Sequence, residues 1–147
     1  MDLQIKSLED TKKLAVELSA GVKAGNVYAL YGDLGSGKTT FTGYFTKEIM
    51  GEAVRVQSPT FVIARTYING NVSAKIRKIF HLDLYRIQSL TDLHELDIDD
   101  FFNDPAAVTI IEWPEIAEEI LPKDKTVRIY FKYIDETTRQ IKIQNLH

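Results

Sequence analysis

Apolar positions along the chain follow helical and strand-like spacings, and these spacings predict the order of its elements. Residues 7–25 (SLEDTKKLAVELSAGVKAG) predict an amphipathic helix that is capped at Ser7 or Asp10. Residues 26–32 (NVYALYG) are a short apolar run typical of a buried strand, and residues 39–51 predict a second helix. The residues expected to form the apolar face of the first helix are Leu14, Val16, Leu18 and Val22.

The second half of the chain is richer in strand-forming residues. Residues 61–68 and 76–83 contain many β-branched and aromatic side chains, and the Asn69-Gly70 pair between them predicts a hairpin turn. Residues 89–104 have helical spacing. The remaining expected elements are a buried strand over 107–113, a short helix over 114–122, and a terminal hairpin formed by 126–134 and 139–146.

This order of elements predicts an α/β fold in a single domain, residues 1–147. A strand followed by a glycine-rich loop and a helix is the beginning of a βαβ unit, whose strands lie parallel. A chain of 147 residues suits one compact domain, and 44% hydrophobic with 27% charged residues is ordinary for a globular protein.

Composition excludes several classes of function. The formal net charge of −3 argues against a large basic face, so we expect no DNA binding. The sequence contains no cysteine, which excludes a disulfide framework, a thiolate metal site and a thiol nucleophile. It also contains no apolar run of about twenty residues and no cleavable apolar leader. We therefore expect neither a membrane span nor export, and a cytoplasmic location.

The stretch GDLGSGKTT carries the strongest chemical signal. Gly32, Gly37, Lys38 and Thr39 occupy every fixed position of the phosphate-binding pattern G-x-x-x-x-G-K-S/T. Glycines let backbone N–H groups wrap the phosphates, and the following helix directs its positive end at the same anion. Lys38 is expected to reach the β- and γ-phosphates, Thr39 to bind Mg2+, and Thr40 to donate to the α-phosphate. A glycine-rich turn without a ligand would need neither the lysine nor the hydroxyl.

A magnesium–nucleotide site also needs a carboxylate at the end of a buried strand. Glu112 follows an apolar run and is one candidate, although a solvated strand end is the alternative interpretation. Asp83 shares a predicted strand face with His81 and Tyr85, and its alternative is the polar face of a half-exposed strand. Two separate acids suit one metal ligand and one residue that orients a water molecule.

Several other residues have two interpretations each. The segment Ser58-Pro59-Thr60 either senses the γ-phosphate through a hydroxyl group or forms an ordinary turn. His81 is interpreted as a hydrogen-bonded strand residue rather than a base. Arg86 is an arginine finger or part of a structural ion pair. Trp113 stacks on a base or ribose, or packs in the core or its rim.

Four motifs together resemble one known family. GDLGSGKTT, SPTF (58–61), HLDLYR (81–86) and IIEWPE (111–116) occur in the order and spacing of the bacterial tRNA threonylcarbamoyladenosine biosynthesis ATPases, the TsaE (YjeE) family. The resemblance extends from about Thr11 to the final hairpin. The first motif is shared by many ATPases and GTPases, whereas the other three are far more specific.

The resemblance implies a fold, an activity and partners. The fold would be P-loop NTPase-like, with three layers and a mainly parallel central sheet extended by antiparallel strands. The activity would be a weak ATPase that binds ATP and Mg2+, and ADP after turnover, and works with the TsaD and TsaB proteins. TsaD transfers a threonylcarbamoyl group onto the adenosine beside the tRNA anticodon. tRNA would therefore reach this chain only indirectly or through the complex.

The resemblance also implies roles for individual residues. Asp83 would be important for hydrolysis, Thr60 would belong to a switch-like segment, and Glu112 would hold Mg2+ together with Thr39. The residues implied to contact the nucleotide are Thr11, Gly35, Ser36, Gly37, Lys38, Thr39 and Thr40.

The sequence departs from the family pattern at two places. The family usually carries a glycine after the acidic helix, whereas Asp97 stands there in this chain. The terminal hairpin usually has a Gly-Arg pair near its turn, whereas Thr138 precedes Arg139 here. We therefore leave Arg139 out of the expected site.

Two alternative functions remain open at this point. A small-molecule P-loop kinase would need an acceptor pocket and usually an arginine-rich lid, but the arginines here are scattered along the chain. A nucleotide-gated scaffold would bind ATP with incidental hydrolysis. A GTPase is disfavoured because the sequence contains no N-K-x-D stretch for reading guanine.

Overall fold

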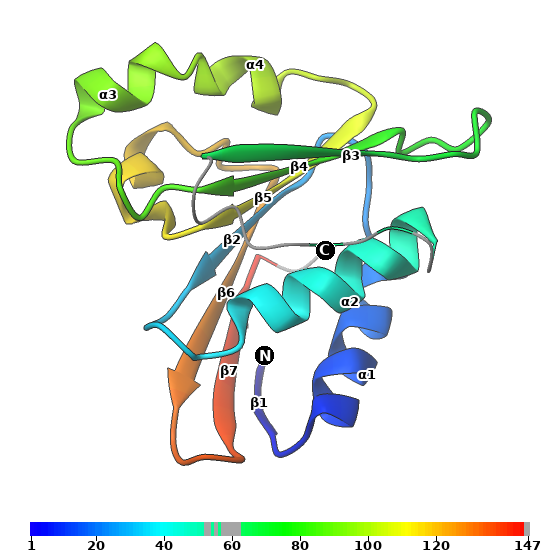
Figure 1. Cartoon of the computed structure of the whole chain (residues 1–147), viewed down its shortest axis with the longest axis vertical. Helices are drawn as coiled ribbons and strands as arrows, with labels where there is room; N and C mark the ends of the chain where they lie inside the picture. The colour runs from blue at the N-terminus through cyan, green and yellow to red at the C-terminus, as the bar shows by residue number, and fades with distance from the viewer. Residues whose placement is uncertain (52–53, 55, 57–62, 146–147) are drawn as a thin grey trace.

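The computed structural model describes residues 1–51, 54, 56 and 63–145. The strands are β1 (Asp2–Ile5), β2 (Val27–Tyr31), β3 (Ala64–Ile68), β4 (Lys78–Asp83), β5 (Ala107–Glu112), β6 (Thr126–Tyr133) and β7 (Arg139–Gln144). The helices are α1 (Leu8–Ser19), α2 (Lys38–Met50), α3 (Leu90–Glu95), α4 (Ile98–Phe102) and the 3₁₀ helix η1 (Pro114–Ile120). The strands form one seven-stranded sheet in the order β1-β7-β6-β2-β5-β4-β3 (Figure 1).

The centre of the sheet is parallel and its two sides are antiparallel. β6, β2, β5 and β4 run parallel to one another, whereas β3 at one edge and β7 and β1 at the other pair antiparallel to their neighbours. This arrangement confirms the expected fold class. In the parallel centre Glu112 lies in register with both Leu30 and Asp83. The carboxyl ends of β2, β4 and β5 therefore meet at one edge of the sheet.

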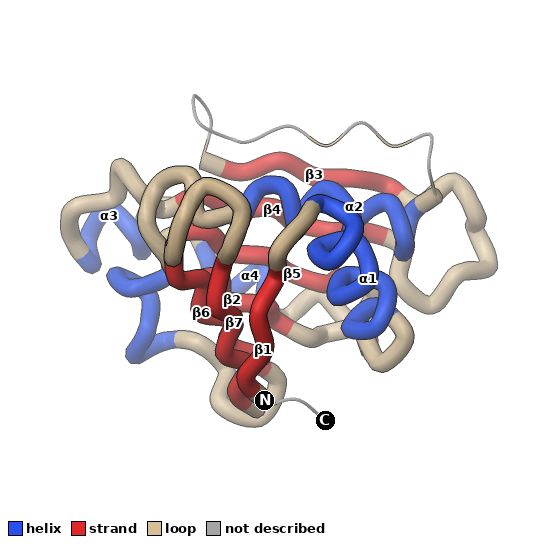
Figure 2. Tube along the Cα trace, turned by 90° about the horizontal axis from the view of Figure 1, so that it is seen from below, coloured by secondary structure: helices blue, strands red, loops and turns tan. Residues whose placement is uncertain are grey.

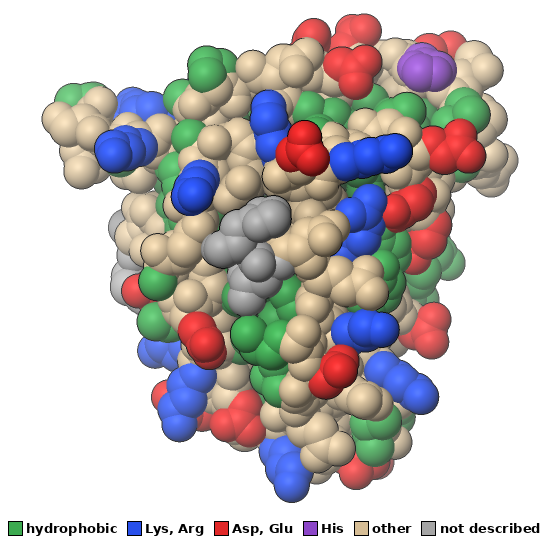
Figure 3. All heavy atoms as spheres, turned by 180° about the vertical axis from the view of Figure 1, so that it is seen from behind, with side chains coloured by type: hydrophobic (Ala, Val, Ile, Leu, Met, Phe, Trp, Pro, Cys, Tyr) green, Lys and Arg blue, Asp and Glu red, His purple; other side chains and the backbone are tan. Residues whose placement is uncertain are grey.

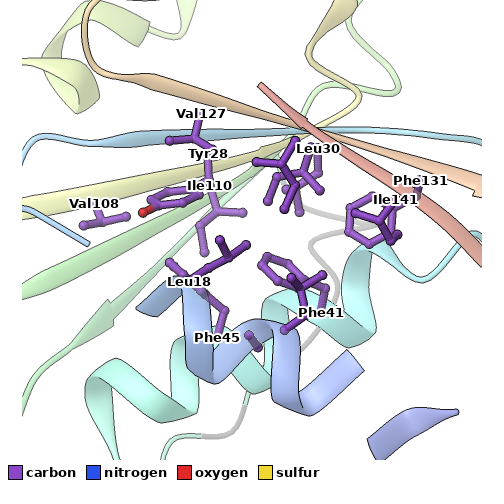
Figure 4. Packing of buried hydrophobic residues seen from close by; sticks show 14 of the residues in the cluster. Leu18, Tyr28, Leu30, Phe41, Phe45, Val108, Ile110, Val127, Phe131 and Ile141 are labelled. Atoms are coloured by element: carbon purple, nitrogen blue, oxygen red, sulfur yellow. The ribbon is translucent and has the colours of Figure 1, made fainter. Parts of the chain in front are cut away.

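Helices cover both faces of the sheet, so the molecule has three layers (Figures 1 and 2). α1 and α2 pack on one face, where Phe45 of α2 contacts Tyr28 of β2 with 4.8 Å between ring centroids. Figure 4 shows apolar side chains from α1 and α2 pointing toward those of the strands. α3, α4 and η1 pack on the other face around Ile111 of β5. Because both faces of β5 are buried, its sequence AVTIIE is mostly apolar instead of alternating between apolar and polar residues.

The first predicted helix exists, but it is shorter than predicted. Ser7 caps α1, because its side chain accepts a hydrogen bond from the backbone N–H of Asp10 at 3.1 Å. The helix ends at Ser19, before the predicted limit at Gly25. Leu14 and Leu18 are buried as expected, whereas Val16 is 40% exposed. Val16 lies two positions from each leucine, and residues two apart in a helix point in different directions, so its side chain faces away from the core.

Two features of the fold were missed or predicted wrongly. No strand was predicted before residue 7, yet β1 pairs with β7 at the edge of the sheet. The predicted helix over 89–104 is two helices, α3 and α4, which are separated at Asp97. Asp97 has φ = 51°, in the left-handed region where glycine is favoured. A glycine at this position in the TsaE-like pattern is explained by the same backbone angle.

The connection between β3 and β4 is also longer than a tight Asn-Gly turn. The two strands pair as predicted, with Ile68 opposite Lys78, so residues 69–77 form the loop. Asn69 organises this loop, because its side-chain amide donates to the backbone oxygen of Ile76 and accepts from the N–H of Asn71.

The surface has a mixed charge pattern. On the face shown in Figure 3, Lys and Arg side chains lie among Asp and Glu side chains rather than in one basic area. Among the described residues, no helix combines the length and apolar character that crossing a membrane requires.

Candidate active site

The loop between β2 and α2 has the backbone that the phosphate-binding motif demands. Gly35 and Gly37 have φ values of 76° and 103°, which favour glycine. A Cβ at Gly32 would lie 2.5 Å from the backbone oxygen of Phe131, so no larger residue fits there without a backbone shift. Gly37 is the residue before α2 and has no side chain with which to cap the helix. The first N–H groups of α2 are thereby left for a ligand.

Lys38 lies inside this loop rather than in solvent. The residue is only 5% exposed, and its ammonium group donates a hydrogen bond to the backbone oxygen of Gly32. The same ammonium group lies 3.5 Å from the centroid of the Trp113 ring. Burial lowers the pKa of Lys38, and the neighbouring Glu112 and Glu115 carboxylates oppose that change. A positive charge is therefore held at the place where the motif would bind phosphate.

Glu112 is a buried carboxylate with a partner on each oxygen. It ends β5 and is 3% exposed, so the alternative of a solvated strand end is wrong. The Thr39 hydroxyl donates to Oε1 at 2.9 Å, and Nε2 of His81 lies 2.6 Å from Oε2. This contact agrees with the interpretation of His81 as a hydrogen-bonded strand residue. The predicted metal ligands, Thr39 and Glu112, are thus in direct contact.

The donor set of this site fits Mg2+ bound together with phosphates. Thr39 and Glu112 offer the oxygen ligands that Mg2+ prefers. Within the part of the chain that the structure describes, no group of three or more His, Cys, Asp or Glu side chains could hold a metal ion. Mg2+ commonly binds through one or two protein ligands and completes its shell with phosphate oxygens and water.

Asp83 ends β4 beside Glu112. Its Oδ1 accepts a hydrogen bond of 2.9 Å from the backbone N–H of Tyr85. Burial raises the pKa of Asp83, and the Glu112 carboxylate adds to the rise, whereas the bond from Tyr85 opposes it. A partly desolvated carboxylate with a raised pKa is a better proton acceptor than an exposed one.

A single cavity of about 670 Å3 unites the predicted residues. It lies over the carboxyl ends of the parallel strands, where ligands bind in open α/β sheets. Ser36 is 1% exposed, and among the described residues its hydroxyl oxygen has no hydrogen-bond partner. Thr60 lies outside the described residues. The predicted site residues that line the cavity are Thr11, Gly35, Ser36, Gly37, Lys38, Thr39, Thr40, Asp83 and Glu112.

The cavity also has residues that the sequence analysis did not include. Arg139, at the start of β7, donates a hydrogen bond of 3.1 Å from its guanidinium group to the backbone oxygen of Gly35. The guanidinium carbon lies 4.5 Å from the centroid of the Tyr133 ring. Glu136 and Thr137, in the turn before β7, line the cavity as well. The signal was the family's Gly-Arg pair near the hairpin turn. Arg139 was left out of the expected site because Thr138 replaces the glycine of that pair, yet the arginine still reaches the loop.

Two residues with open interpretations also line the cavity. Trp113 has φ = 56° and is half-buried, and its ring lies against Lys38 and 4.8 Å from the ring of Tyr85. Its position at the cavity agrees with either a ligand-facing or a rim residue. Arg86 lines the same cavity. Both are therefore placed at the candidate site rather than in the core.

Comparisons with known proteins agree with the family resemblance of the sequence motifs. Residues 5–141 match the family model TsaE, threonylcarbamoyl adenosine biosynthesis protein TsaE. The chain is 34% identical over 141 residues to the tRNA threonylcarbamoyladenosine biosynthesis protein TsaE of Rickettsia bellii, covering 96% of this chain and 92% of that protein. It is 36% identical over 133 residues to the TsaE protein of Bacillus subtilis, covering 90% and 78%. The crystal structure of Bacillus subtilis YdiB has a similar fold, with a TM-score of 0.76 and 29% identity over 100% of this chain and 86% of that chain.

Proposed function

This chain belongs to the TsaE family of threonylcarbamoyl adenosine biosynthesis proteins, and on that premise we propose that it binds ATP in the cavity and hydrolyses it weakly in the presence of Mg2+. The hydrolysis would be required for threonylcarbamoyladenosine formation beside the tRNA anticodon, together with the TsaD and TsaB proteins. The observation that carries the proposal is the convergence of Lys38, Thr39, Asp83 and Glu112 on one cavity behind a phosphate-binding loop.

The loop and the first turn of α2 would bind the triphosphate. The left-handed backbone at Gly35 and Gly37 makes a concave loop, and Lys38 supplies a buried positive charge for the β- and γ-phosphates. The unpartnered Ser36 hydroxyl, noted among the described residues, is a further donor inside the loop. Thr40, at the first turn of α2, lines the cavity and would donate to the α-phosphate.

The metal-binding residues would be Thr39 and Glu112. Their hydrogen bond of 2.9 Å already places the hydroxyl and the carboxylate side by side. Bound Mg2+ would neutralise the charge that develops on the β- and γ-phosphate oxygens. Glu112 then keeps one oxygen anchored by His81 while the other faces Thr39.

Asp83 would orient the water molecule that attacks the γ-phosphorus. In this step the bond between the γ-phosphorus and the bridging oxygen breaks, ADP leaves, and the water proton passes to the Asp83 carboxylate. The bond from the Tyr85 N–H fixes one carboxylate oxygen and leaves the other for the water. A raised pKa suits Asp83 to accept the proton.

Activity of the isolated chain is expected to be weak because its lysine is already partly engaged. The Lys38 ammonium bonds to the Gly32 oxygen and lies against the Trp113 ring, and these contacts would compete with phosphate for an ammonium group that keeps further donors. We propose that the partner proteins favour the rearranged state. Two alternatives remain. In a nucleotide-gated scaffold, ATP binding matters and hydrolysis is incidental. A small-molecule kinase would transfer the phosphate to an acceptor other than water.

The deciding experiment is the rate of ATP hydrolysis by the purified chain, measured with and without the TsaD–TsaB pair. We expect slow Mg2+-dependent release of phosphate that the pair increases, and threonylcarbamoyladenosine formation that requires all three proteins. Phosphate release without stimulation, together with phosphorylation of an added small molecule, would instead favour the kinase. Full support of tRNA modification by the Asp83→Asn variant without turnover would favour the scaffold.

A further inference from the structure

His81 is a fully buried polar residue in the parallel part of the sheet. It lies in β4 with 0% of its side chain exposed, and it pairs with Arg65 of β3 and Ile110 of β5. Buried histidines need hydrogen-bond partners, and Nε2 has one in Oε2 of Glu112 at 2.6 Å. Among the described residues, Nδ1 has no partner. The polar contact of this ring is therefore directed at Glu112.

The chemistry of the two groups fixes the direction of this hydrogen bond. An ionised carboxylate can only accept, so Nε2 of His81 carries the proton and donates. Thr39 donates to the other oxygen, Oε1, at 2.9 Å. Two donors on two different oxygens hold the carboxylate plane of Glu112 in one orientation.

An unrestrained carboxylate would have another partner in this cavity. The Lys38 ammonium lies within electrostatic range of Glu112, and both side chains line the cavity. Even so, Lys38 and Glu112 form no ion pair within residues 1–51, 54, 56 and 63–145, the part of the chain that the structure describes. Lys38 bonds to the Gly32 oxygen instead. The contact with His81 holds Glu112 toward Thr39 and leaves the lysine charge available.

We propose that His81 is a positioning residue that holds Glu112 in its metal-binding orientation and prevents it from pairing with Lys38. The inference rests on the proposed function, in which Thr39 and Glu112 hold Mg2+ beside the phosphates. Groups that hydrogen-bond to metal ligands typically change metal affinity about 10- to 100-fold when they are removed.

Two amide variants that differ by one methylene group test the proposal. In His81→Gln the amide nitrogen is as many bonds from Cγ as Nε2 is, so it still donates toward Glu112. In His81→Asn the amide group falls at the position of Nδ1, away from Glu112. Ile79→Val in the same strand, at another fully buried position, controls for a change in the core.

The readout is ADP affinity measured by calorimetry, once with excess Mg2+ and once with a metal chelator. We expect wild type, His81→Gln and Ile79→Val to show the same gain in affinity from Mg2+. In His81→Asn that gain should fall about 10-fold or more. Thermal unfolding of each ligand-free variant shows whether it is folded. If His81→Asn does not fold, the proposal is tested by His81→Gln, which must keep the wild-type gain in ADP affinity from Mg2+.

The outcomes separate this inference from the proposed function. No ADP binding by the wild-type chain in either condition would contradict the proposed function itself. Wild-type binding with an unchanged Mg2+ gain in a folded His81→Asn variant would overturn only the role of His81. Equal losses for His81→Asn with and without Mg2+, or a His81→Gln variant as impaired as His81→Asn, would also overturn it.

Discussion

The cavity has two walls of different character. The motif wall consists of residues 35–40 with Asp83 and Glu112. The flanking wall consists of residues 5–8, Thr11, Glu136, Thr137 and Arg139. The motif wall has buried charges held by side-chain contacts, such as the bonds of Glu112 to Thr39 and His81. The flanking wall is formed by a helix cap and a hairpin turn near the surface, in which Asp135 accepts from the N–H groups of Thr137 and Thr138.

The difference shows that reactivity and shape come from separate parts of this chain. The motif wall contains the groups that we propose bind phosphate, bind a metal and orient water. The flanking wall contributes shape and two cations, Lys6 and Arg139, of which Arg139 reaches across to the Gly35 oxygen. Changes in the motif wall should therefore alter binding and turnover strongly, whereas changes in the flanking wall should alter affinity or stability modestly.

The largest effect is expected from Lys38→Met, which keeps the apolar stem and removes the buried charge. Charge-assisted contacts contribute about 1.5–3 kcal/mol each, so the loss of contacts to two phosphates should weaken ATP binding at least about 100-fold. Calorimetric titration with ATP checks this result. Lys47→Met, at the other end of α2, is the matched control and should bind as wild type does. Unchanged affinity in Lys38→Met would remove the motif wall from nucleotide binding.

The next effect is expected from Asp83→Asn, which should lower turnover while ATP affinity stays within about threefold. General acid–base groups contribute about 100-fold or more to rates, so phosphate release should fall by about that factor. The measurement is steady-state hydrolysis with the TsaD–TsaB pair present. Asp92→Asn, an exposed acid in the first turn of α3, is the control. Wild-type turnover in Asp83→Asn would exclude the proposed water-orienting role.

A smaller effect is expected from Arg139→Ala in the flanking wall. This change removes the bond to the Gly35 oxygen and should leave the loop less ordered before ATP binds. One such hydrogen bond contributes about 1 kcal/mol, so we expect the affinity for ADP, measured by calorimetric titration, to fall about three- to tenfold. Lys142→Ala, an exposed cation on the same strand, should have no effect on ADP titration. A loss as large as that of Lys38→Met would erase the distinction between the walls.

The smallest effect on binding is expected from Ser7→Ala, which removes the cap of α1. Loss of a helix cap typically lowers the free energy of unfolding by about 1 kcal/mol. ADP affinity should stay within about twofold, since the Ser7 hydroxyl is used on the Asp10 N–H. Urea denaturation measures the stability, and Ser19→Ala at the last residue of α1, whose hydroxyl bonds only within the helix, is the control. A large loss of affinity in a stable variant would assign this wall a direct role in binding.

The sequence was most informative where a function constrains neighbouring residues. The loop from Gly32 to Thr40 demands glycine, lysine and hydroxyl groups at fixed spacings, so its place between a strand and a helix could be predicted. The parallel centre followed from the order of elements, and its carboxyl ends bring Asp83 and Glu112 together as register partners. The buried pair of His81 with Glu112 could not be predicted, because it depends on that register.

Short elements with weak periodicity were harder to predict. β1 is only 4 residues long and depends on pairing with β7 rather than on its own composition. The division between α3 and α4 depends on one left-handed residue, Asp97, in a segment with uninterrupted helical spacing. The contact of Arg139 with Gly35 joins residues separated by 104 positions, so only the family's Gly-Arg pattern pointed to this arginine, and Thr138 interrupts that pattern here.

The 104 positions between Gly35 and Arg139 affect how the chain folds during synthesis. The phosphate-binding loop leaves the ribosome early, but Arg139 and the strand that pairs with β1 follow much later. Distant contacts of this kind form slowly, because closing a long loop costs entropy before any contact compensates for it. A nascent chain halted before Arg139 would contain the whole motif and still lack the cation that bonds to the Gly35 oxygen. Nucleotide binding, which stabilises only the folded state, would therefore mark the moment at which the early and late parts of the sheet have joined.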